Sequence, residues 1–291
     1  METRFTFGGD EHLLCECSEA MSMDAFFKSL ASVRAIREAN IKGVVEVAGG
    51  NASYLVRFDP DVTHPNDMLE TVKAIDLQAE RSEPILETRI YEIPVYYQDP
   101  WTHEGLMRFR ERHQDPDGTD LEYAARINGY DTVDAFIKAH HGSPWFVSQV
   151  GFVCGVPWLY QMVERERQIE APKYVRPRTD TPLQTIGHGG AFAAIYAVRG
   201  AGGYQMFGIT PMPIYQPHPA EPYMGDDLVF CRAGDIVKFR PIEREEYDSI
   251  LAAIEKHQWS PPIKNVKFDL REFETDIDAY NNNLVEVLYD D

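Results

Sequence analysis

The stretch Gly151-Phe152-Val153-Cys154-Gly155-Val156-Pro157-Trp158-Leu159 opens the part of this chain that decides its fold. Two more glycine-marked blocks follow it in order, at residues 177–190 and 202–211. Glycines packed this densely beside aromatic and β-branched residues indicate backbone with positive φ, or backbone that a strand or a ligand approaches closely. Short apolar runs alternate with Gly and Pro over residues 147–240, which predicts a β-barrel.

The residues before the barrel predict a small α+β domain at 1–97. Period-2 runs favour strands and a 3.6-residue periodicity favours helices, and a turn at Gly49-Gly50-Asn51 joins two of the strands. Elements in this order are typical of a sandwich with its helices on one face of a sheet. The expected strands are 11–17, 41–47, 53–58 and 89–96, and the expected helices are 23–40 and 65–79.

An insert and helical linker at 98–145 connects this domain to the barrel. Its polar part carries three arginines among apolar residues within 104–114: Arg108, Arg110 and Arg112. This pattern fits a short solvated helix, or a docking element for a partner subunit. Two further helices are expected at 120–128 and 132–140, the second with Thr132 as its N-cap.

The barrel domain at 146–242 is followed by a helix and an acidic tail at 243–291. The helix is expected over 244–258, and the prolines of Trp259-Ser260-Pro261-Pro262 end it. Acidic residues far outnumber basic ones over 269–291, and aromatic and aliphatic residues are spread among them. The tail is therefore either a solvated extension or a segment that wraps a partner by burying its apolar residues.

Length and charge limit the classes of function. The 291 residues allow two medium domains with apolar cores, and the net charge is −19. Such a charge opposes binding to nucleic acid or to an anionic membrane. The sequence shows neither a signal peptide nor eighteen consecutive apolar residues, so we expect a soluble, cytoplasmic protein.

The four cysteines favour neither a disulfide framework nor a zinc site. They lie at 15, 17, 154 and 231, without a Cys-x-x-Cys pair. Cys15 and Cys17 share one face of a strand and are expected to be buried small apolar residues. Cys154 lies between glycines in an expected loop, where we expect a buried thiol; the alternative is a nucleophile activated by a helix N-terminus.

The three glycine-marked blocks resemble the family of allophanate hydrolase subunit 1, the KipI-type proteins. This family also occurs as half of the carboxyltransferase domain of urea carboxylase and as a subunit of prokaryotic 5-oxoprolinase. The resemblance covers most of residues 5–245 and keeps the spacing inside each block. The residues that carry it are His140, Gly151-Phe152, Gly155, Pro157-Trp158-Leu159, Pro177-Arg178, Pro182, Gly187, Gly190, Ile195-Tyr196, Gly202-Gly203-Tyr204, Gly208 and Thr210-Pro211.

The chain departs from the family pattern at polar positions. Phe192-Ala193 stands where the family has Gln-Thr, Ile209 where it has Arg, and Cys154 where it has Pro. Losing an amide, a hydroxyl and a guanidinium removes groups that could orient a polar substrate or stabilise a developing anion. A urea or allophanate substrate is therefore doubtful, and the replacements suit either a less polar substrate or a pocket without activity.

The resemblance implies a cyclophilin-like barrel as the second domain and a function that needs other subunits. It implies a non-ATP-binding subunit of a multi-subunit, ATP-dependent carboxylase or amidohydrolase, whose partners are a subunit-2-like chain or an ATP-binding carboxylase- or oxoprolinase-type subunit. The apolar replacements favour a ketone-like substrate, as in acetophenone-type carboxylases. The alternative is a KipI-like regulatory binding protein without chemistry of its own.

The candidate catalytic residues are His140, Arg178 and His188. His140 occupies the family's His position and could act as a general acid or base, or be structural. Arg178 keeps the family's arginine and could hold a carboxylate or carboxyphosphate, or form a structural ion pair. His188 lies between glycines that could help bind an anion, although we expect a solvent-facing turn.

The glycine-marked blocks also predict a substrate pocket. Because the sequence contains no P-loop or dinucleotide fingerprint, we expect no nucleotide, other cofactor or metal to bind this chain directly, and ATP to bind a partner. The expected pocket residues are Phe152, Cys154, Trp158, Phe192, Tyr196, Tyr204, Ile209 and Thr210.

Overall fold

The computed structural model of the chain describes residues 2–79, 83–218 and 221–290. Its contacts divide the chain into two compact units. Unit 1 consists of Met1–Leu86 together with Phe268–Glu274, and unit 2 of Glu87–Lys267 together with Thr275–Asp291. The division therefore falls near residue 86 and near residue 270, and each unit is described by itself.

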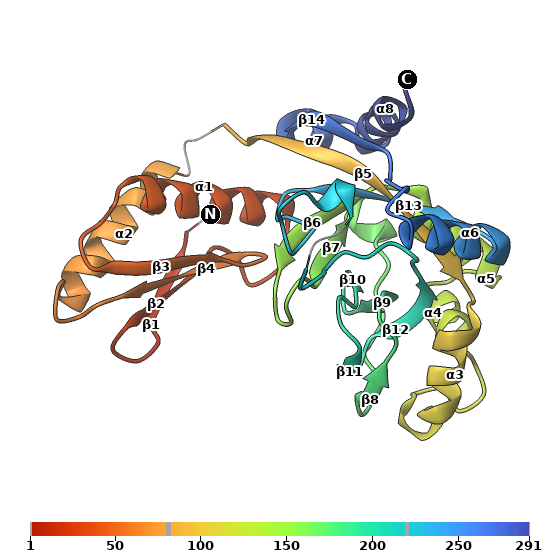
Figure 1. Cartoon of the computed structure of the whole chain (residues 1–291). Helices are drawn as coiled ribbons and strands as arrows, with labels where there is room; N and C mark the ends of the chain where they lie inside the picture. The colour runs from red at the N-terminus through yellow and green to blue at the C-terminus, as the bar shows by residue number, and fades with distance from the viewer. Residues whose placement is uncertain (1, 80–82, 219–220, 291) are drawn as a thin grey trace. The chain divides into compact units, whose positions relative to one another are not determined.

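Unit 1 is an antiparallel four-stranded sheet with two helices packed on one face (Figure 1). The strand order is β1-β2-β4-β3, and the buried face of β2 and β4 carries alternating apolar residues such as Leu13, Cys15 and Val56. The elements are β1 (Arg4–Phe7), β2 (His12–Glu16), α1 (Met23–Glu38), β3 (Val44–Gly49), β4 (Ser53–Phe58) and α2 (Pro65–Ala79).

A buried carboxylate joins the elements of unit 1. Asp76 on α2 is 4% exposed. Its oxygens accept hydrogen bonds from Thr3 at 2.7 Å, from Ser32 at 2.8 Å and from Tyr54 at 2.8 Å. These donors come from the N-terminal segment, α1 and β4, so one side chain fixes how both helices lie on the sheet.

The sheet of unit 2 closes on itself. Its strand order is β12-β9-β10-β7-β6-β13-β5-β14, and an additional pairing of β12 with β5 makes a ring of all these strands except β14. Apolar side chains inside the ring form the largest core, including Trp145, Leu159 and Phe207. The strands are β5 (Ile85–Tyr97), β6 (Trp145–Val150), β7 (Pro157–Gln161), β9 (Thr185–Gly189), β10 (Phe192–Ile195), β12 (Gln205–Ile209), β13 (Ile236–Pro241) and β14 (Ile263–Asp269).

The expected strand at 89–96 exists but has different partners. It is β5, and it pairs with β12, β13 and β14 in the large sheet. The prediction that it completes the small domain is therefore wrong. Consecutive side chains from Ile90 to Val95 are all buried, so periodicity could not indicate which sheet the strand joins.

Helices and a two-stranded ribbon complete unit 2. The start of α5 is capped as expected, since the Thr132 hydroxyl accepts a hydrogen bond from the amide of Ala135 at 3.1 Å. The elements are α3 (Pro100–Arg108), α4 (Asp120–Ile127), α5 (Val133–Gly142), β8 (Arg178–Thr181), β11 (Gly200–Gly202), α6 (Arg244–Ile254) and α8 (Ile277–Tyr289), with α7 (Leu270–Thr275) counted mostly in unit 1.

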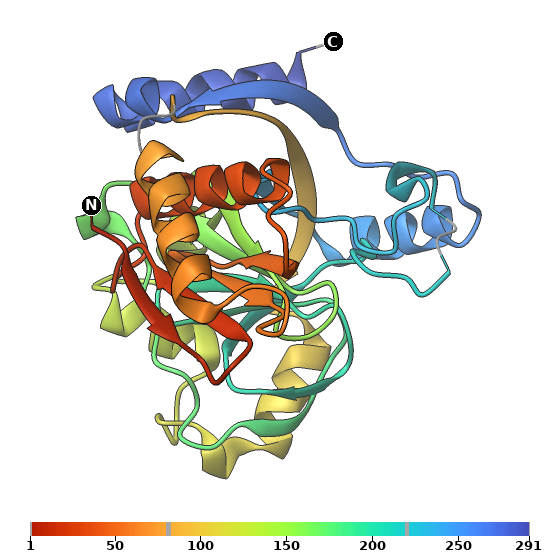
Figure 2. The ribbon, with the colours of Figure 1, turned by 90° about the vertical axis from the view of Figure 1, so that its left-hand side faces the viewer.

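The acidic tail is an ordered part of the fold. Helix α8 runs beside β14 in both ribbon views (Figures 1 and 2). Leu284 and Leu288 are buried, and the amide of Asn281 donates to the carbonyl of Met162 at 2.6 Å. The apolar residues of the tail thus pack against this chain, and the expectation of a solvated extension is wrong.

The arginines of the insert also bind groups of this chain. The helix ends at Arg108, earlier than expected, and Arg108 pairs with Asp180 at 2.6 Å. Arg110 donates to the carbonyl of Pro116 at 2.8 Å, and Arg112 to that of Pro177 at 2.7 Å. The insert is therefore folded onto the rest of unit 2 through the side chains that the sequence suggested for docking a partner.

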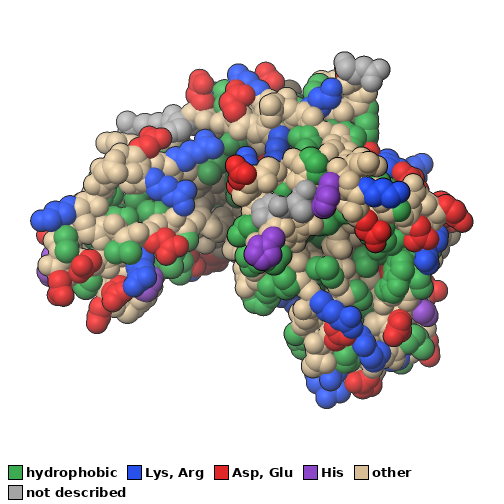
Figure 3. Space-filling view, viewed as in Figure 1, with side chains coloured by type: hydrophobic (Ala, Val, Ile, Leu, Met, Phe, Trp, Pro, Cys, Tyr) green, Lys and Arg blue, Asp and Glu red, His purple; other side chains and the backbone are tan. Residues whose placement is uncertain are grey.

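Charged side chains of both signs are interspersed over the face drawn in Figure 3. Among the described residues, no helix combines the length and the apolar character needed to span a membrane.

Candidate functional site

His140 lies in the aromatic interior of unit 2. Its side chain is fully buried, and Nδ1 forms a 2.8 Å hydrogen bond with the hydroxyl of Tyr97. The ring stacks on Phe239 with centroids 5.2 Å apart. Burial, with the nearby charges of His188 and His141, holds the pKa of His140 well below its usual value. The imidazole is neutral at physiological pH and does not face solvent.

His188 lies on β9 and is also fully buried, so the expectation of a solvent-facing turn is wrong. Its Nε2 donates to the carbonyl of Ile169 at 2.9 Å. Burial lowers the pKa of His188 to about 4. The flanking glycines belong to a strand rather than to an anion-binding turn, because close packing of Tyr196 and Tyr204 leaves no room for a Cβ at Gly187.

The two histidines share their neighbours. Trp145 lies 5.0 Å from the His140 ring and 5.8 Å from the His188 ring, between centroids. Phe207 lies 5.3 Å and 5.8 Å from the same two rings. The structure therefore brings together two of the three predicted catalytic residues, in an aromatic core.

Arg178 lies in β8, in a different part of unit 2, and is fully buried. Its guanidinium stacks over the ring of Tyr174, with Cζ 4.3 Å from the centroid. Nε donates to the hydroxyl of Thr181 at 3.3 Å. The other two nitrogens, Nη1 and Nη2, have no hydrogen-bond partner among the described residues. A structural ion pair, one of the two roles considered for Arg178, is not found among the described residues. The nearby guanidinium opposes the rise that burial causes in the pKa values of Tyr174 and Tyr196.

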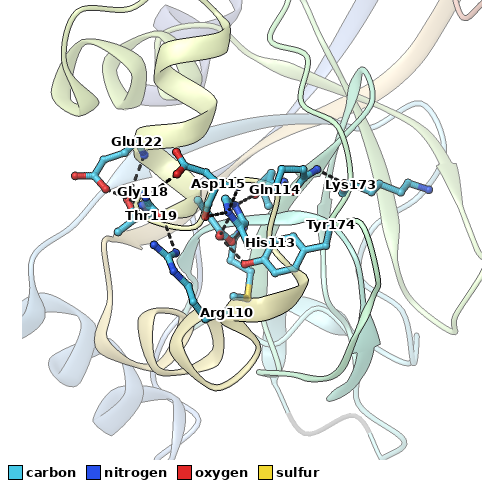
Figure 4. A network of polar contacts seen from close by, with 12 residues as sticks. Arg110, His113, Gln114, Asp115, Gly118, Thr119, Glu122, Lys173 and Tyr174 are labelled. Atoms are coloured by element: carbon cyan, nitrogen blue, oxygen red, sulfur yellow. Dashed lines mark hydrogen bonds and ion pairs between the residues drawn. The ribbon is translucent and has the colours of Figure 1, made fainter.

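A polar network links Tyr174 to the start of α4 (Figure 4). The hydroxyl of Tyr174 donates to Asp120 at 2.5 Å, and the amide of Met206 donates to the same carboxylate at 2.6 Å. The Nε2 atom of His113 lies 3.3 Å from Asp120 and forms a 2.8 Å hydrogen bond with Gln205. Burial raises the pKa of Asp120, and the hydrogen bonds from Tyr174 and Met206 oppose that rise.

Asp120 also lines a cavity of about 250 Å³ between α3, α4 and β12. A second buried carboxylate, Asp99, caps α3 and accepts the amides of Trp101 and Thr102 at 2.9 Å each. Burial raises the pKa of Asp99. Phe207 connects the cavity wall to the two buried histidines. The lining residues are Gln98, Asp99, Thr102, His103, Leu106, Thr119, Asp120, Leu121, Met206 and Phe207.

Four of the predicted pocket residues form a connected aromatic surface on the outside of the ring. Trp158 lies 6.4 Å from Phe152, 5.8 Å from Phe192 and 6.0 Å from Tyr204, between ring centroids. Alternation explains the arrangement, because Leu159 between Trp158 and Tyr160 points into the core. The exposed fraction of Phe152 is 89%. We call Phe152, Trp158, Phe192 and Tyr204 the aromatic surface.

The remaining predicted pocket residues do not belong to the aromatic surface. Tyr196 lies beside Tyr204, and its hydroxyl accepts the Tyr204 amide at 3.4 Å. Ile209 packs in a separate apolar cluster with residues of α6. Thr210 is buried, and its hydroxyl accepts a hydrogen bond from the amide of Met212 at 3.2 Å. Cys154 is exposed, so the expectation of a buried thiol is wrong.

The network around Asp120 was not predicted from the sequence. Its members are His113, Asp120, Tyr174 and Gln205, which come from three separate stretches of the chain and carry no shared motif. One signal was present: Thr119 and Glu122 form a capping box, with the Glu122 amide donating to Thr119 at 3.2 Å. That signal locates the start of α4 but does not indicate a polar interior. Among the described residues, no group of three or more His, Cys, Asp or Glu is placed to hold a metal ion.

The comparisons with known proteins agree with this fold. The family model described as the carboxyltransferase domain, subdomain C and D, matches residues 3–224. The chain belongs to this carboxyltransferase family. The match covers the whole described part of the small sheet and most of the ring, so both carry the family pattern.

Members of the carboxyltransferase family that resemble this chain are parts of larger proteins or assemblies. A 5-oxoprolinase subunit from Bacillus subtilis is 32% identical over 159 residues, which are 55% of this chain and 55% of that protein. A urea amidolyase from Lachancea kluyveri is 24% identical over 91% of this chain but only 15% of its own length. The chain thus spans about half of the first relative and a small part of the second.

The solved structures support the same fold. The urea carboxylase of Kluyveromyces lactis superposes with a TM-score of 0.82 at 21% identity, over 98% of this chain and 26% of that one. At this identity the likeness establishes the mixed α/β fold alone. The expected α+β class is therefore confirmed at that level.

Proposed function

We propose that this chain is a non-ATP-binding subunit of a multi-subunit, ATP-dependent carboxylase or amidohydrolase. The observation that carries the proposal is the family match over residues 3–224, together with the similarity to a 5-oxoprolinase subunit and to urea amidolyase. In this proposal the ring of unit 2 is a cyclophilin-like barrel, ATP binds a carboxylase- or oxoprolinase-type partner subunit, and the complex works in the cytoplasm.

The proposed substrate has an apolar body of the ketone type used by acetophenone-type carboxylases. The aromatic surface supports this choice because it offers ring faces rather than amide or hydroxyl groups. Phe192 supplies one of those rings at a position where the family pattern has Gln. His140 and His188 are proposed as positioning residues, since both are buried and contact the wall of the cavity beside Asp120 through Phe207.

The test is to isolate the tagged full chain from its native cells at low salt and identify what co-elutes. ATP hydrolysis by the complex is then measured with acetophenone, urea and 5-oxoproline as separate substrates. The proposal expects an ATP-binding partner and hydrolysis that requires both this chain and the ketone. Hydrolysis that proceeds equally without this chain would contradict it.

Variants separate the substrate from the assembly. Trp158→Ala removes the ring that contacts the other three members of the aromatic surface, so we expect ketone-dependent hydrolysis at limiting ketone to fall at least about tenfold, as for loss of an aromatic contact. Leu77→Ala is the matched control, since Leu77 is 61% exposed in unit 1. If both variants keep full activity, the aromatic surface does not bind the substrate.

The second candidate is a KipI-like regulatory binding protein. Phe152 favours it: this exposed ring stands on a backbone with φ of +73°, which is unusual for a residue with a side chain. An aromatic residue held out of the surface is typical of an anchor at a protein interface. Co-elution with a kinase, without ATP hydrolysis that depends on this chain, would favour this candidate.

A further inference from the structure

We propose that helix α3 and residues 109–112 form a lid over the cavity beside Asp120. The lid opens when the contacts of Arg108 and Arg112 with residues 177–180 break. All of these residues belong to unit 2. The lid controls access to the cavity whichever reaction the proposed complex catalyses.

The cavity shows that α3 is incompletely packed against β12. It occupies about 250 Å³ between α3, α4 and β12. Protein interiors contain few voids larger than a water molecule, whose share of liquid volume is about 30 Å³. The exposed lining residues Gln98 and His103 mark the mouth of the cavity, whereas Leu106, Met206 and Phe207 on its inner wall are buried. Solvent therefore has little access to the inner wall while α3 is in place.

The lid is fixed at both ends. At its start, the carboxylate of Asp99 caps α3, and Trp101 packs on Tyr247 of α6 with ring centroids 5.2 Å apart. After its end, the buried side chain of His113 forms a 2.8 Å hydrogen bond with Gln205. A segment held at two such points can swing as one body about the line that joins them.

Between these ends, apolar packing holds α3 only weakly. Of its nine residues, Thr102, Gly105 and Leu106 are buried. Leu106 belongs to a small apolar cluster with Tyr174 and Met206. Most of the stability of a short helix in a protein comes from packing an apolar face, and one leucine gives α3 little of it. Elements with few buried apolar contacts open locally more readily than those of a core.

Polar contacts at the surface hold the C-terminal end of α3. Arg108 pairs with Asp180 at 2.6 Å, and the two side chains are 44% and 26% exposed. Asp180 also pairs with Arg199 at 2.7 Å, and Arg112 donates to the carbonyl of Pro177 at 2.7 Å. Ion pairs at exposed positions contribute little to stability and are screened by salt. The contacts of Arg108 and Arg112, which we call the latch, can therefore break while the rest of unit 2 stays folded.

Cysteine labelling measures the opening of the lid. Leu106→Cys places a thiol on the inner wall of the cavity, in a full chain whose exposed Cys154 is replaced by Ser. The protein is incubated with iodoacetamide, and the labelled peptides are quantified by mass spectrometry. The native Cys231 is buried in the core and reports global unfolding in the same sample. We expect position 106 to be labelled slowly, because α3 covers the thiol until the lid opens, but faster than Cys231.

Combining Arg108→Gln with Arg112→Gln removes the latch. Labelling at position 106 should then accelerate at least about threefold, because the open state no longer costs these contacts. Raising sodium chloride from about 50 to about 500 mM should act in the same direction on the latched protein. Arg167→Gln is the matched control, since Arg167 pairs with Asp278 at 2.8 Å and is 49% exposed. Equal rates at position 106 in all three proteins, or an equal acceleration at Cys231, would overturn the proposal.

Hydrogen exchange makes the test independent of the introduced cysteine. In a chain that keeps Leu106, the amides of residues 105–109 should exchange faster without the latch than in wild type, while those of α5 stay unchanged. Faster exchange in both segments would mean that the two arginines stabilise unit 2 as a whole. Unchanged exchange at 105–109 would mean that α3 stays closed without its latch, and either result contradicts the proposal.

Discussion

The two buried imidazoles make the stability of unit 2 depend on pH. Both His140 and His188 have folded-state pKa values below that of an exposed histidine, about 6.5, because of burial. Below that pH the two histidines are protonated in the unfolded chain, whereas in the folded chain they stay neutral until the pH is lower. Stability is therefore fully present above about pH 6.5 and is lost as the pH falls toward 4.

From the folded-state pKa of about 4 for His188, we expect this histidine to lower the free energy of unfolding by about 2 kcal/mol between pH 7.5 and pH 5, and His140 to act in the same direction. Urea unfolding at the two pH values measures the change. His188→Gln removes one titrating group and should reduce the pH dependence, whereas His103→Gln, at an exposed position, should not. A pH dependence that is the same in all three proteins would contradict the assignment.

In unit 1, the buried carboxylate of Asp76 gives another prediction for a single residue. Replacing Asp76 with Ala leaves the hydroxyls of Thr3, Ser32 and Tyr54 without their common acceptor. We expect a loss of about 3 kcal/mol in the free energy of unfolding, measured in urea. Asp61→Ala, at an exposed position, should change stability by less than about 0.5 kcal/mol. Similar results for both would show that the network contributes nothing.

Single residues were predicted well where burial follows from alternation. Cys15 and Cys17 are both buried, as the period-2 pattern predicted. The burial of His188 and the exposure of Cys154 were predicted wrongly. Both residues have glycine neighbours, and glycines occur both in exposed turns and in strands packed against large side chains. The sequence does not distinguish these two uses of glycine.

Helix starts that carry a clear signal were predicted closely. Helix α2 starts at Pro65, as the proline predicted, and Thr132 caps α5 as expected. The helix in the insert was misplaced because its start is marked by Asp99 and Pro100, ahead of the arginine cluster on which the prediction rested. Strand β1 was missed, since its short sequence Arg4–Phe7 is largely exposed.

The capping box of α4 gives a prediction at the level of one element. Thr119→Ala removes the hydroxyl that accepts the Glu122 amide, so the free energy of unfolding should fall by about 1 kcal/mol. Asp120 is the residue after Thr119, so we expect this substitution to change the pKa of the Asp120 carboxyl group as well. NMR of the carboxyl carbon measures that pKa. Thr71→Ala, in an exposed turn of α2, is the control and should be nearly neutral. A neutral Thr119→Ala would argue against the capping box.

At the scale of the molecule, the sequence indicated two domains but not that the first is discontinuous. Residues 268–274 belong to unit 1, far along the chain from the rest of it. Phe268 stacks on Phe27 with centroids 5.8 Å apart, and the Leu270 amide donates to the carbonyl of Pro84 at 3.0 Å. Local periodicity cannot predict such a return, because it carries no information on long-range contacts.

Because residues 268–274 belong to unit 1, we expect a substitution among them to weaken unit 1. Phe268→Ala removes a fully buried ring, so unit 1 should lose about 3–5 kcal/mol of stability. Hydrogen exchange of the α1 amides should then accelerate, while that of α5 in unit 2 stays close to wild type. Phe7→Ala, at a ring that is 40% exposed, is the control. Unchanged exchange in α1 would mean that unit 1 is complete without residue 268.

The discontinuity of unit 1 also matters on the ribosome. Met1–Leu86 is synthesised before Phe268, so Phe27 lacks its stacking partner until the stretch between them has been made. At about 5–20 residues per second, translation of the intervening stretch takes on the order of 10–40 s. During that interval the nascent N-terminal unit presents an uncovered aromatic side chain on α1, which makes it a natural client for a chaperone that binds near the exit tunnel.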